Sequence, residues 1–359
     1  MDGNGPRRRR KLEHVVWAAR LPDGGGTGLP DLHLVHDALG EVDLGACCTA
    51  TTLFGHRLAL PLLIGAMTGG APEVSEVNGC LARAAAAAGV GMGVGSQTSA
   101  LDDPAMARSY AVVREAHRDG LVLGNVGARA TPEQAAAAVA MVSADALSVH
   151  LNPAQELFMT EGERAFTGGA ERIARIVAAL PVPVLAKEVG CGIARGPAQR
   201  LLRAGVGGID VAGRGGTDFI GLERARAGRA RETPFAHWGI PTAVALLETL
   251  DAVRGRVPVI ASGGVRSGLE AAACLAAGAA AVGIAGPLLR AALRGGTPAV
   301  LAAIEAFAAE LRTAMALCGA QDIEALRRVP LVVLGATRDW LHERGVATAA
   351  YARRGEVPG

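Results

Sequence analysis

Two glycine-containing turns stand where apolar runs of the sequence end. Gly263 and Gly264 follow the run VPVIAS, and Ala285 and Gly286 follow the run AAVGI. Backbone N–H groups at such turns, with the N-terminus of the helix expected after the first one, can bind a phosphate group, and Arg266 would add a cation. Tight turns that need a positive φ would use glycine equally well. Two such turns at successive runs favour a phosphate site.

The other apolar runs also end in residues that can carry chemistry. These residues are Met67 and Thr68, Ser96 and Gln97, Asn125, His150 and Asn152, Lys187, and Arg214 and Thr217. For a single run, a strand-end turn is a sufficient explanation. The same feature at the end of every run favours a ligand that all of them share.

Lys187 ends an apolar run and would point into a largely uncharged region. A desolvated ammonium group needs an anion nearby. The pyrimidine edge of a flavin, which becomes negative on reduction, would supply one, and Asn125, Ser96 and Thr68 could hydrogen-bond to the same ring. Two other interpretations stay open for Lys187, an ion pair with a carboxylate and the Schiff-base lysine of an aldolase.

These residues must be positioned by eight apolar runs that alternate with alanine-rich helical patterns such as TPEQAAAAVAMV and RSGLEAAACLAAG. Eight strand–helix units predict an α/β fold, a (β/α)8 TIM barrel with an N-terminal extension, whose site lies at the carboxyl ends of the strands. An open doubly wound sheet is the alternative, but the first run lacks its G-x-G-x-x-G signature. The runs span residues 61–70, 89–97, 121–128, 146–152, 182–190, 207–216, 257–264 and 280–286.

The sequence divides into three expected parts. Residues 1–57 form a basic, partly flexible N-terminal extension that packs on or caps the barrel, because this segment has no core of its own. Residues 58–345 would form the (β/α)8 barrel that holds the flavin, and residues 346–359 a C-terminal tail. On charge patterning alone, the run RRRRKLEH would be a disordered basic arm.

Composition narrows the class of partner. The 36 Lys and Arg residues against 34 Asp and Glu leave a formal net charge of +2, which gives no reason to expect nucleic acid. The six cysteines are scattered without zinc-ligand spacing and are expected to be reduced. The sequence has no apolar run of about 18 residues that would predict a membrane span. We expect a cytoplasmic protein that acts on a small molecule.

Several motifs, taken together and in order, resemble the type 2, FMN-dependent isopentenyl diphosphate isomerases. The resemblance runs from about Arg10 to Pro330, and the stretch HLNPAQE and the basic N-terminal motif are its most specific parts. The motifs are RKLEH, AMTGG, GSQ, GNVG, HLNPAQE, TEGERAFTG, VLAKEVGCG, VAGRGGTDF, ASGGVRSG and AGPLL.

The resemblance implies interconversion of isopentenyl and dimethylallyl diphosphates with reduced FMN and Mg²⁺, with NADPH needed to reduce the FMN, in a homo-oligomer of four or eight chains. Lys187, Gln155 and His150 would be the catalytic residues. The substrate would be met by Arg10, Lys11, His14, His150, Asn152 and Gln155, and the magnesium ion by Glu156. FMN would be held by Ala66, Met67, Thr68, Ser96, Asn125, Lys187, Thr217, Gly263, Gly264, Arg266, Ala285 and Gly286.

Two positions depart from the family pattern. Thr98 stands after GSQ, where many members have a diphosphate-binding arginine, and Met159 and Thr160 stand where many have glutamine and proline. That glutamine is a candidate proton relay in the family, and methionine cannot relay a proton. Either the flavin itself would carry the acid–base step, or the enzyme would act on a different substrate. Two alternatives are an FMN oxidoreductase of the 2-hydroxy acid oxidase type, for which His237 lies in an unfavourable position before the seventh run, and a non-catalytic flavin-binding homologue.

Overall fold

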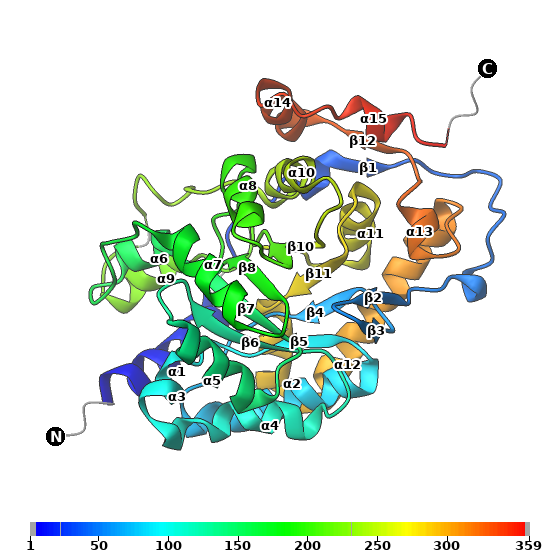
Figure 1. Cartoon of the computed structure of the whole chain (residues 1–359). Coiled ribbons are helices and arrows are strands. Elements are labelled where there is room, and N and C mark those ends of the chain that lie inside the picture. Colours follow the sequence, from blue (N-terminus) through cyan, green and yellow to red (C-terminus); the bar gives the residue numbers. More distant parts are fainter. Residues whose placement is uncertain (1–4, 22, 231, 356–359) are drawn as a thin grey trace.

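The computed structural model describes the backbone of residues 5–355 except 22 and 231, and it describes the side chains from residue 11 onward. Eight parallel strands close into a barrel in the order β10-β11-β4-β5-β6-β7-β8-β9 (Figure 1). The strands are β4 (Leu62–Ile64), β5 (Gly91–Gly93), β6 (Val122–Gly127), β7 (Ala146–Leu151), β8 (Val184–Glu188), β9 (Gly208–Asp210), β10 (Val259–Ser262) and β11 (Ala281–Ile284). Each lies within one of the eight predicted runs, so the predicted TIM barrel is confirmed.

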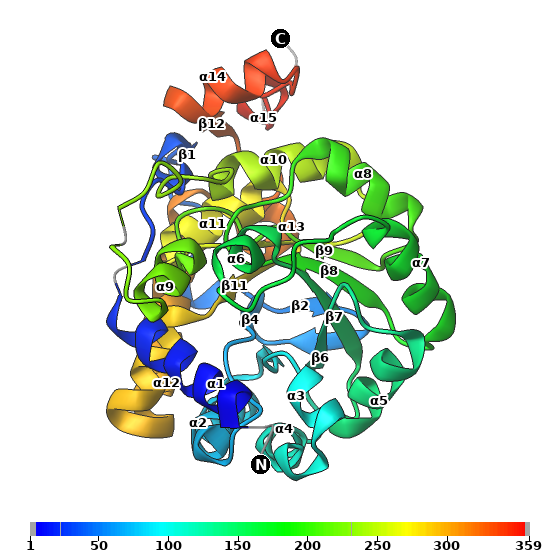
Figure 2. The same cartoon turned by 90° about the vertical axis from the view of Figure 1, so that its left-hand side faces the viewer.

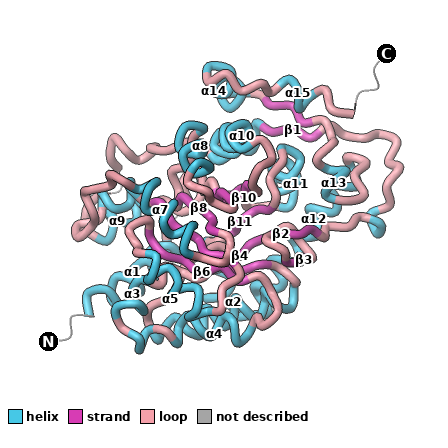
Figure 3. The backbone as a smooth tube through the Cα atoms, in the orientation of Figure 1, coloured by secondary structure: helices cyan, strands magenta, loops and turns pink. Residues whose placement is uncertain are grey.

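Helices surround the barrel on the outside (Figures 2 and 3). Their ends follow the local sequence: Thr131 caps α5 in a capping box with Gln134, and the Ser267 hydroxyl accepts a hydrogen bond from Glu270 N at the start of α11. The main helices are α2 (Ser75–Ala88), α4 (Arg108–Ala116), α5 (Pro132–Val142), α7 (Gly169–Ala179), α8 (Arg195–Arg203), α10 (Thr242–Val253), α11 (Gly268–Ala277) and α12 (Gly286–Leu317).

Shorter helices lie in the loops and extensions. Among the helices of the described part, none has the length and apolar character that a bilayer span requires. The short helices are η1 (Leu29–Asp31), η2 (Leu44–Ala46), η3 (Pro72–Val74), α3 (Thr98–Asp102), η4 (Pro104–Met106), α6 (Pro153–Phe158), α9 (Phe219–Arg226), α13 (Ile323–Leu326) and α15 (Ala349–Ala352).

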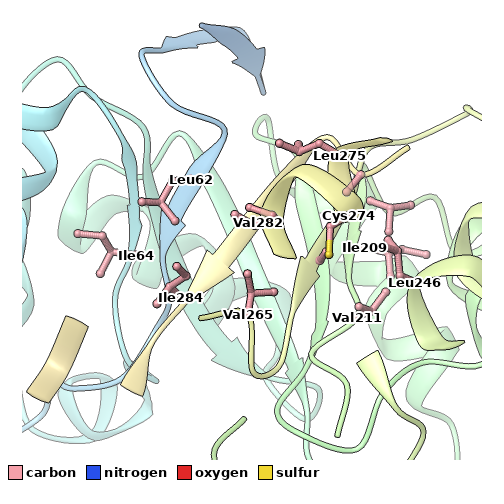
Figure 4. Close-up of a cluster of buried hydrophobic side chains, with 14 of the residues drawn as sticks. Leu62, Ile64, Ile209, Val211, Leu246, Val265, Cys274, Leu275, Val282 and Ile284 are labelled. Atoms are coloured by element: carbon pink, nitrogen blue, oxygen red, sulfur yellow. The ribbon is translucent and has the colours of Figure 1, made fainter. Parts of the chain in front are cut away.

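Alternate residues of the barrel strands serve two separate hydrophobic layers. Leu62 and Ile64 of β4 pack outward in the large cluster between strands and helices (Figure 4), whereas Leu63 points into the barrel. This follows from the two-residue period of a β-strand. Truncating a fully buried leucine such as Leu62 to alanine should cost about 2–5 kcal/mol of folding free energy.

A hairpin of β2 (Thr51–Leu53) and β3 (His56–Leu58) closes the amino-terminal end of the barrel. Leu53 and Leu58 are buried in the same cluster as Leu63. The hairpin spans residues 51–58 and therefore crosses the expected boundary between residues 57 and 58. The sequence analysis missed this element because its strands are only three residues long.

The extensions at the two ends of the chain are joined to each other and to the barrel. Strand β1 (Leu32–Leu34) pairs antiparallel with β12 (Leu331–Val333), after which α14 (Gly335–Glu343) follows. The buried Glu248 carboxylate of α10 accepts hydrogen bonds from Trp340 Nε1 at 3.2 Å and Arg344 Nε at 3.0 Å. These bonds hold the C-terminal segment against the barrel helices.

The basic N-terminal segment is helical rather than a disordered arm. Helix α1 (Gly5–Arg20) lies across α9 and α12 on the side of the barrel shown in Figure 2. Val15 and Ala18 of α1 are buried against Leu222 of α9 and Leu289 of α12. Apolar residues at helical spacing in the stretch VVWAA therefore give this segment a face that packs on the barrel helices. The interpretation as a disordered arm considered only the charges and left out these apolar residues.

Candidate active site

A cavity opens at the carboxyl ends of the barrel strands, where the sequence predicted the site. Eight of the twelve residues expected to hold FMN line it, and they come from the loops or ends after β4, β8, β9, β10 and β11. The eight are Ala66, Met67, Lys187, Thr217, Gly263, Gly264, Ala285 and Gly286. The remaining four, Thr68, Ser96, Asn125 and Arg266, lie around it without lining it.

Glycine is required at both positions of the first turn. Gly263 has φ 102° and Gly264 has φ 84°, values that L-residues with a side chain rarely adopt. A Cβ on Gly263 would lie 2.1 Å from Gly213 O, and one on Gly264 would lie 2.3 Å from Gly215 O. The turn interpretation and the phosphate interpretation are therefore compatible, because this conformation leaves the glycine backbone at the cavity wall.

Two helices begin beside these turns and place their N-termini at the same end of the cavity. Helix α11 begins at Gly268, three residues after the cavity-lining Val265, and α12 begins at Gly286 itself. Two arginines are also present, Arg266 and Arg290, with the Asp23 carboxylate between them. We call this region, formed by Gly263, Gly264, Gly286, Arg266 and Arg290, the phosphate cup. Arg290 and Asp23 were not among the residues predicted from the sequence.

Lys187 does not point into an uncharged region, and that expectation was wrong. Its Nζ lies 2.9 Å from Asp210 Oδ2 and 3.4 Å from Ser262 Oγ. Asp210 is the register partner of Lys187 across β8 and β9, so the parallel pairing itself brings the carboxylate to the ammonium. The ion pair considered among the alternatives is thus present, while Lys187 also lines the cavity.

The polar residues that follow β4 and β5, and Asn125 within β6, bond to protein groups. The buried Thr68 hydroxyl donates to Asn78 Oδ1, and Ser96 Oγ lies 3.2 Å from Thr98 Oγ1. Asn125 Nδ2 donates to Val94 O at 3.0 Å. These contacts fix the loops that surround the cavity.

His150 is a neutral base beside the cavity, because it is the register partner of the cavity-lining Lys187 across β7 and β8. We call the region of His150, Lys11, His14, Gln155 and Glu223 the cavity mouth. Its Nδ1 lies 3.0 Å from Asn125 Oδ1. Burial, together with the positive charges of Lys11 and Lys187, lowers the pKa of His150 from 6.5 to about 4. A neutral ring that donates Nδ1–H to the Asn125 carbonyl keeps an unprotonated Nε2.

Helix α1 delivers two of the expected substrate-binding residues to this mouth. Lys11 Nζ donates to Ser96 O at 3.1 Å, and His14 Nε2 donates to Glu223 Oε1 at 2.9 Å. Burial lowers the pKa of His14, and the charges of Arg226 and Lys11 lower it further against the raising effect of Glu223. The backbone of Arg10 belongs to α1, but its side chain lies outside the described residues.

Glu223 joins several parts of the mouth and was not predicted. Its side chain is fully buried at 0 % exposure; Oε1 accepts from both His14 and Gln155 Nε2, each at 2.9 Å, and Oε2 pairs with Arg226. Burial alone would raise the pKa of Glu223, but the bonds from His14 and Gln155 and the Arg226 charge lower it overall. The carboxylate is therefore ionised and anchors α1 and α6 to α9.

The stretch after β7 forms a compact polar group. Asn152 Nδ2 donates to Gln155 Oε1 at 3.2 Å and to Glu156 Oε1 at 2.9 Å, and Glu156 Oε2 accepts from Glu163 N at 2.8 Å. With Oε1 and Nε2 both bonded, the Gln155 amide has one fixed orientation. In the described part of the chain, no three His, Cys, Asp or Glu side chains converge on a metal position.

A compositional signal could have identified this mouth. The sequence has two lysines, Lys11 and Lys187, among its 36 basic residues. Both lie close enough to His150 to lower its pKa, although 176 residues separate them along the chain (187 − 11). In a sequence whose other basic residues are arginines, the two lysine positions are therefore candidate site residues, because a compact ammonium group and a planar guanidinium are not interchangeable.

The two departures from the family pattern lie near the mouth. Thr98 is exposed at the start of α3, and Met159 is buried at the end of α6. Met159 O accepts a hydrogen bond from Arg164 Nη2 at 2.9 Å. The Met159 side chain is buried, and a thioether offers no exchangeable proton.

Comparison with known proteins assigns the family. The sequence model of the FMN-dependent dehydrogenase family matches residues 123–332. The chain is 48 % identical to an isopentenyl-diphosphate delta-isomerase of Symbiobacterium thermophilum over 98 % of this chain and 99 % of that protein. The chain belongs to the isopentenyl-diphosphate delta-isomerase family. An archaeal relative with the same name, from Methanothermobacter thermautotrophicus, is 41 % identical over 96 % of this chain and 99 % of its own length.

Solved structures with the same barrel come from oxidases. A lactate oxidase of Pediococcus acidilactici superposes with a TM-score of 0.67 at 19 % identity and covers 93 % of this chain and 95 % of its own. A mandelate oxidase bound to a difluorinated hydroxy acid gives a TM-score of 0.60 at 22 % identity, over 90 % of this chain and 99 % of its own. At this identity the likeness establishes the barrel fold.

Proposed function

We propose that this protein interconverts isopentenyl diphosphate and dimethylallyl diphosphate with bound FMN. The observation that carries the proposal is the convergence of two charge-bearing regions on one cavity. The glycines of the phosphate cup and Lys187 lie on its wall, and Lys11 of α1 lies close enough to His150, the register partner of Lys187, to lower its pKa. A family of named isomerases at 39–48 % identity over nearly the whole chain supports the same activity.

The residues of the cavity fit FMN. The phosphate would lie in the phosphate cup, where the turn of Gly263 and Gly264 leaves no room for a Cβ. Lys187 and Asp210 would lie beside the flavin, Lys187 offering its ammonium to the pyrimidine edge. When bound in its reduced form, FMN supplies an electron-rich ring that can exchange a proton with an alkene and stabilise a neighbouring cation.

The chain's own residues would bind and orient the diphosphate. Lys11, on α1, would offer a cation, and His14, Asn152 and Gln155, whose side chains are held by Glu223 and by one another, would offer positioned polar groups. Neutral His150 presents Nε2 as an acceptor, so it adds no positive charge at neutral pH. Gln155, fixed by its bonds to Asn152 and Glu223, would orient the substrate. Met159 has no exchangeable proton and would take no part in proton transfer.

Glu156 is the residue that we propose for Mg²⁺. A single carboxylate with substrate phosphate oxygens and waters is an ordinary magnesium site. The bonds from Asn152 and from the Glu163 N–H hold the Glu156 carboxylate at the mouth, where a diphosphate would need charge neutralisation. The ion would complete its coordination with substrate oxygens.

Three further properties belong to the same proposal. An external reductant such as NADPH would reduce FMN once, since the isomerisation itself is redox-neutral. All six cysteines are free thiols, which supports a reducing compartment such as the cytoplasm. We also propose a homo-oligomer of four or eight chains, which light scattering after size-exclusion chromatography would measure.

Substitution at Lys11 tests the proposed division of the cavity. Lys11→Ala should raise the KM for isopentenyl diphosphate and leave the Kd for FMN unchanged, because Lys11 contacts the mouth and not the phosphate cup. Arg20→Ala removes one charge from an exposed position of the same helix and should change neither constant. Removal of residues 1–9 should largely preserve activity. Equal damage from Lys11→Ala and Arg20→Ala would argue against a specific substrate anchor.

A further inference from the structure

Asp23 places a carboxylate inside the phosphate cup. The residue lies between α1 and η1, lines the cavity, and keeps 14 % of its side chain exposed. Its Oδ1 lies 3.4 Å from Arg290 Nη1, and its Oδ2 lies 3.3 Å from Arg290 Nη2 and 3.4 Å from Arg266 Nη2. A Cβ on Gly286, the first residue of α12, would be 3.5 Å from Oδ1. The carboxylate therefore lies where two guanidinium groups and a helix N-terminus meet.

The segment that carries Asp23 covers the glycine turns. Gly24 N donates to Gly216 O at 2.7 Å, and Ala243 N donates to Thr27 O at 2.9 Å. The Thr27 methyl group is 2.7 Å from the position that a Cβ on Gly264 would take. Residues 23–27 thus form a strip of the N-terminal extension that closes the outer side of the cup.

We propose that Asp23 is an internal counter-ion that occupies the phosphate position of the cup and gives it up when the FMN phosphate binds. This inference rests on the proposed function, since it takes FMN as the ligand. A phosphate monoester carries about −1.5 to −2 charges and a carboxylate carries one, so the phosphate is the stronger partner for two arginines. Repulsion between the two anions would prevent both from holding the same position.

The two arginines differ in what holds them. Arg266 also donates to Gly215 O at 2.6 Å and to Gly264 O at 2.9 Å, so its guanidinium keeps its place without Asp23. For Arg290, the hydrogen bonds found within the described residues go to Asp23. Arg290 is therefore the cation that exchanges Asp23 for the phosphate, while Arg266 is already fixed to receive it.

The test compares flavins with and without a phosphate. Flavin-free full-length protein is titrated with FMN and with riboflavin at low salt, and Kd is read from flavin fluorescence. Removing the competing anion in Asp23→Asn should tighten FMN binding about fivefold to tenfold, an electrostatic effect that shrinks at high salt, and should leave riboflavin binding unchanged. Asp23→Ala should act in the same direction.

The control is Asp43→Asn, which removes the same charge from an exposed position of the extension. This control should change the Kd for neither FMN nor riboflavin, and circular dichroism should show that all variants are folded. Weaker FMN binding by Asp23→Asn would mean that Asp23 orients the arginines, and unchanged binding would mean that it lies outside the cup; either overturns the inference. If the wild type binds neither flavin, the proposed function fails and this inference fails with it.

Discussion

Replacing Glu223 with glutamine should loosen the attachment of α1 at the cavity mouth without affecting the phosphate cup. The Glu223 carboxylate is fully buried, and it accepts hydrogen bonds from His14 and Gln155 at 2.9 Å each. It also neutralises Arg226, whose side chain is 11 % exposed. An amide at this position removes the charge and turns an N–H₂ group toward one of the three donors.

The magnitude follows from these contacts. A hydrogen bond to a charged group contributes about 1.5–3 kcal/mol, and each 1.4 kcal/mol is a factor of about ten. Loss of the His14 contact alone should therefore lower kcat/KM for isopentenyl diphosphate about 10-fold to 100-fold. Because a buried ion pair is broken as well, the free energy of unfolding should fall by about 3–5 kcal/mol.

The assay measures kcat/KM at saturating FMN and Mg²⁺, the Kd for FMN, and urea unfolding on the same preparations. Glu161→Gln is the matched control, because Glu161 pairs with the same Arg226 at 3.1 Å but is 45 % exposed, so its pair should contribute less than about 1 kcal/mol. Similar losses in both variants, or loss of FMN from Glu223→Gln, would refute the role assigned to Glu223.

Three further predictions concern the cup, the metal and pH. Gly264→Ala should purify without flavin, because its Cβ would lie 2.3 Å from Gly215 O, whereas Gly228→Ala, also at positive φ but with nothing within 4 Å, should retain FMN; absorbance at flavin wavelengths measures this. Glu156→Gln should keep FMN but need more Mg²⁺ for half-maximal turnover, and an unchanged Mg²⁺ titration would argue against a metal ligand. Burial and nearby lysines lower the pKa of His150 from 6.5 to about 4, so as the pH falls the unfolded chain takes up this proton before the folded chain does. The free energy of unfolding should therefore fall between pH 6.5 and 4, by up to about 1.4 kcal/mol per pH unit. Urea unfolding of His150→Gln should show a smaller fall over the same range.

The barrel could be predicted from the sequence because its signals are local. Each strand is an apolar run that ends in a polar residue or glycine, and helix starts such as Thr131 and Ser267 have recognisable caps. The carboxyl ends of parallel strands share one end of a barrel, so Lys187 and the glycines of the phosphate cup could be placed together from the sequence alone.

The missed residues depend on contacts between distant segments. Asp23 and Arg290 are 267 residues apart and look like ordinary surface charges in the sequence. Glu223 lies in the stretch GLERAR, which reads as a solvated helix, and only the packing of α1 on α9 buries it. The pairing of Lys187 with Asp210 depends on the β8–β9 register, which apolar runs do not determine.

The central claim is tested most directly by incubating the purified protein with isopentenyl diphosphate, FMN, Mg²⁺ and a small amount of NADPH under anaerobic conditions. The account predicts that dimethylallyl diphosphate accumulates over many turnovers until the two isomers reach equilibrium, while NADPH is consumed only in the amount that reduces the bound FMN. If FMN binds but no dimethylallyl diphosphate forms, or if a 2-hydroxy acid is oxidised steadily under air instead, the proposed isomerase activity is contradicted.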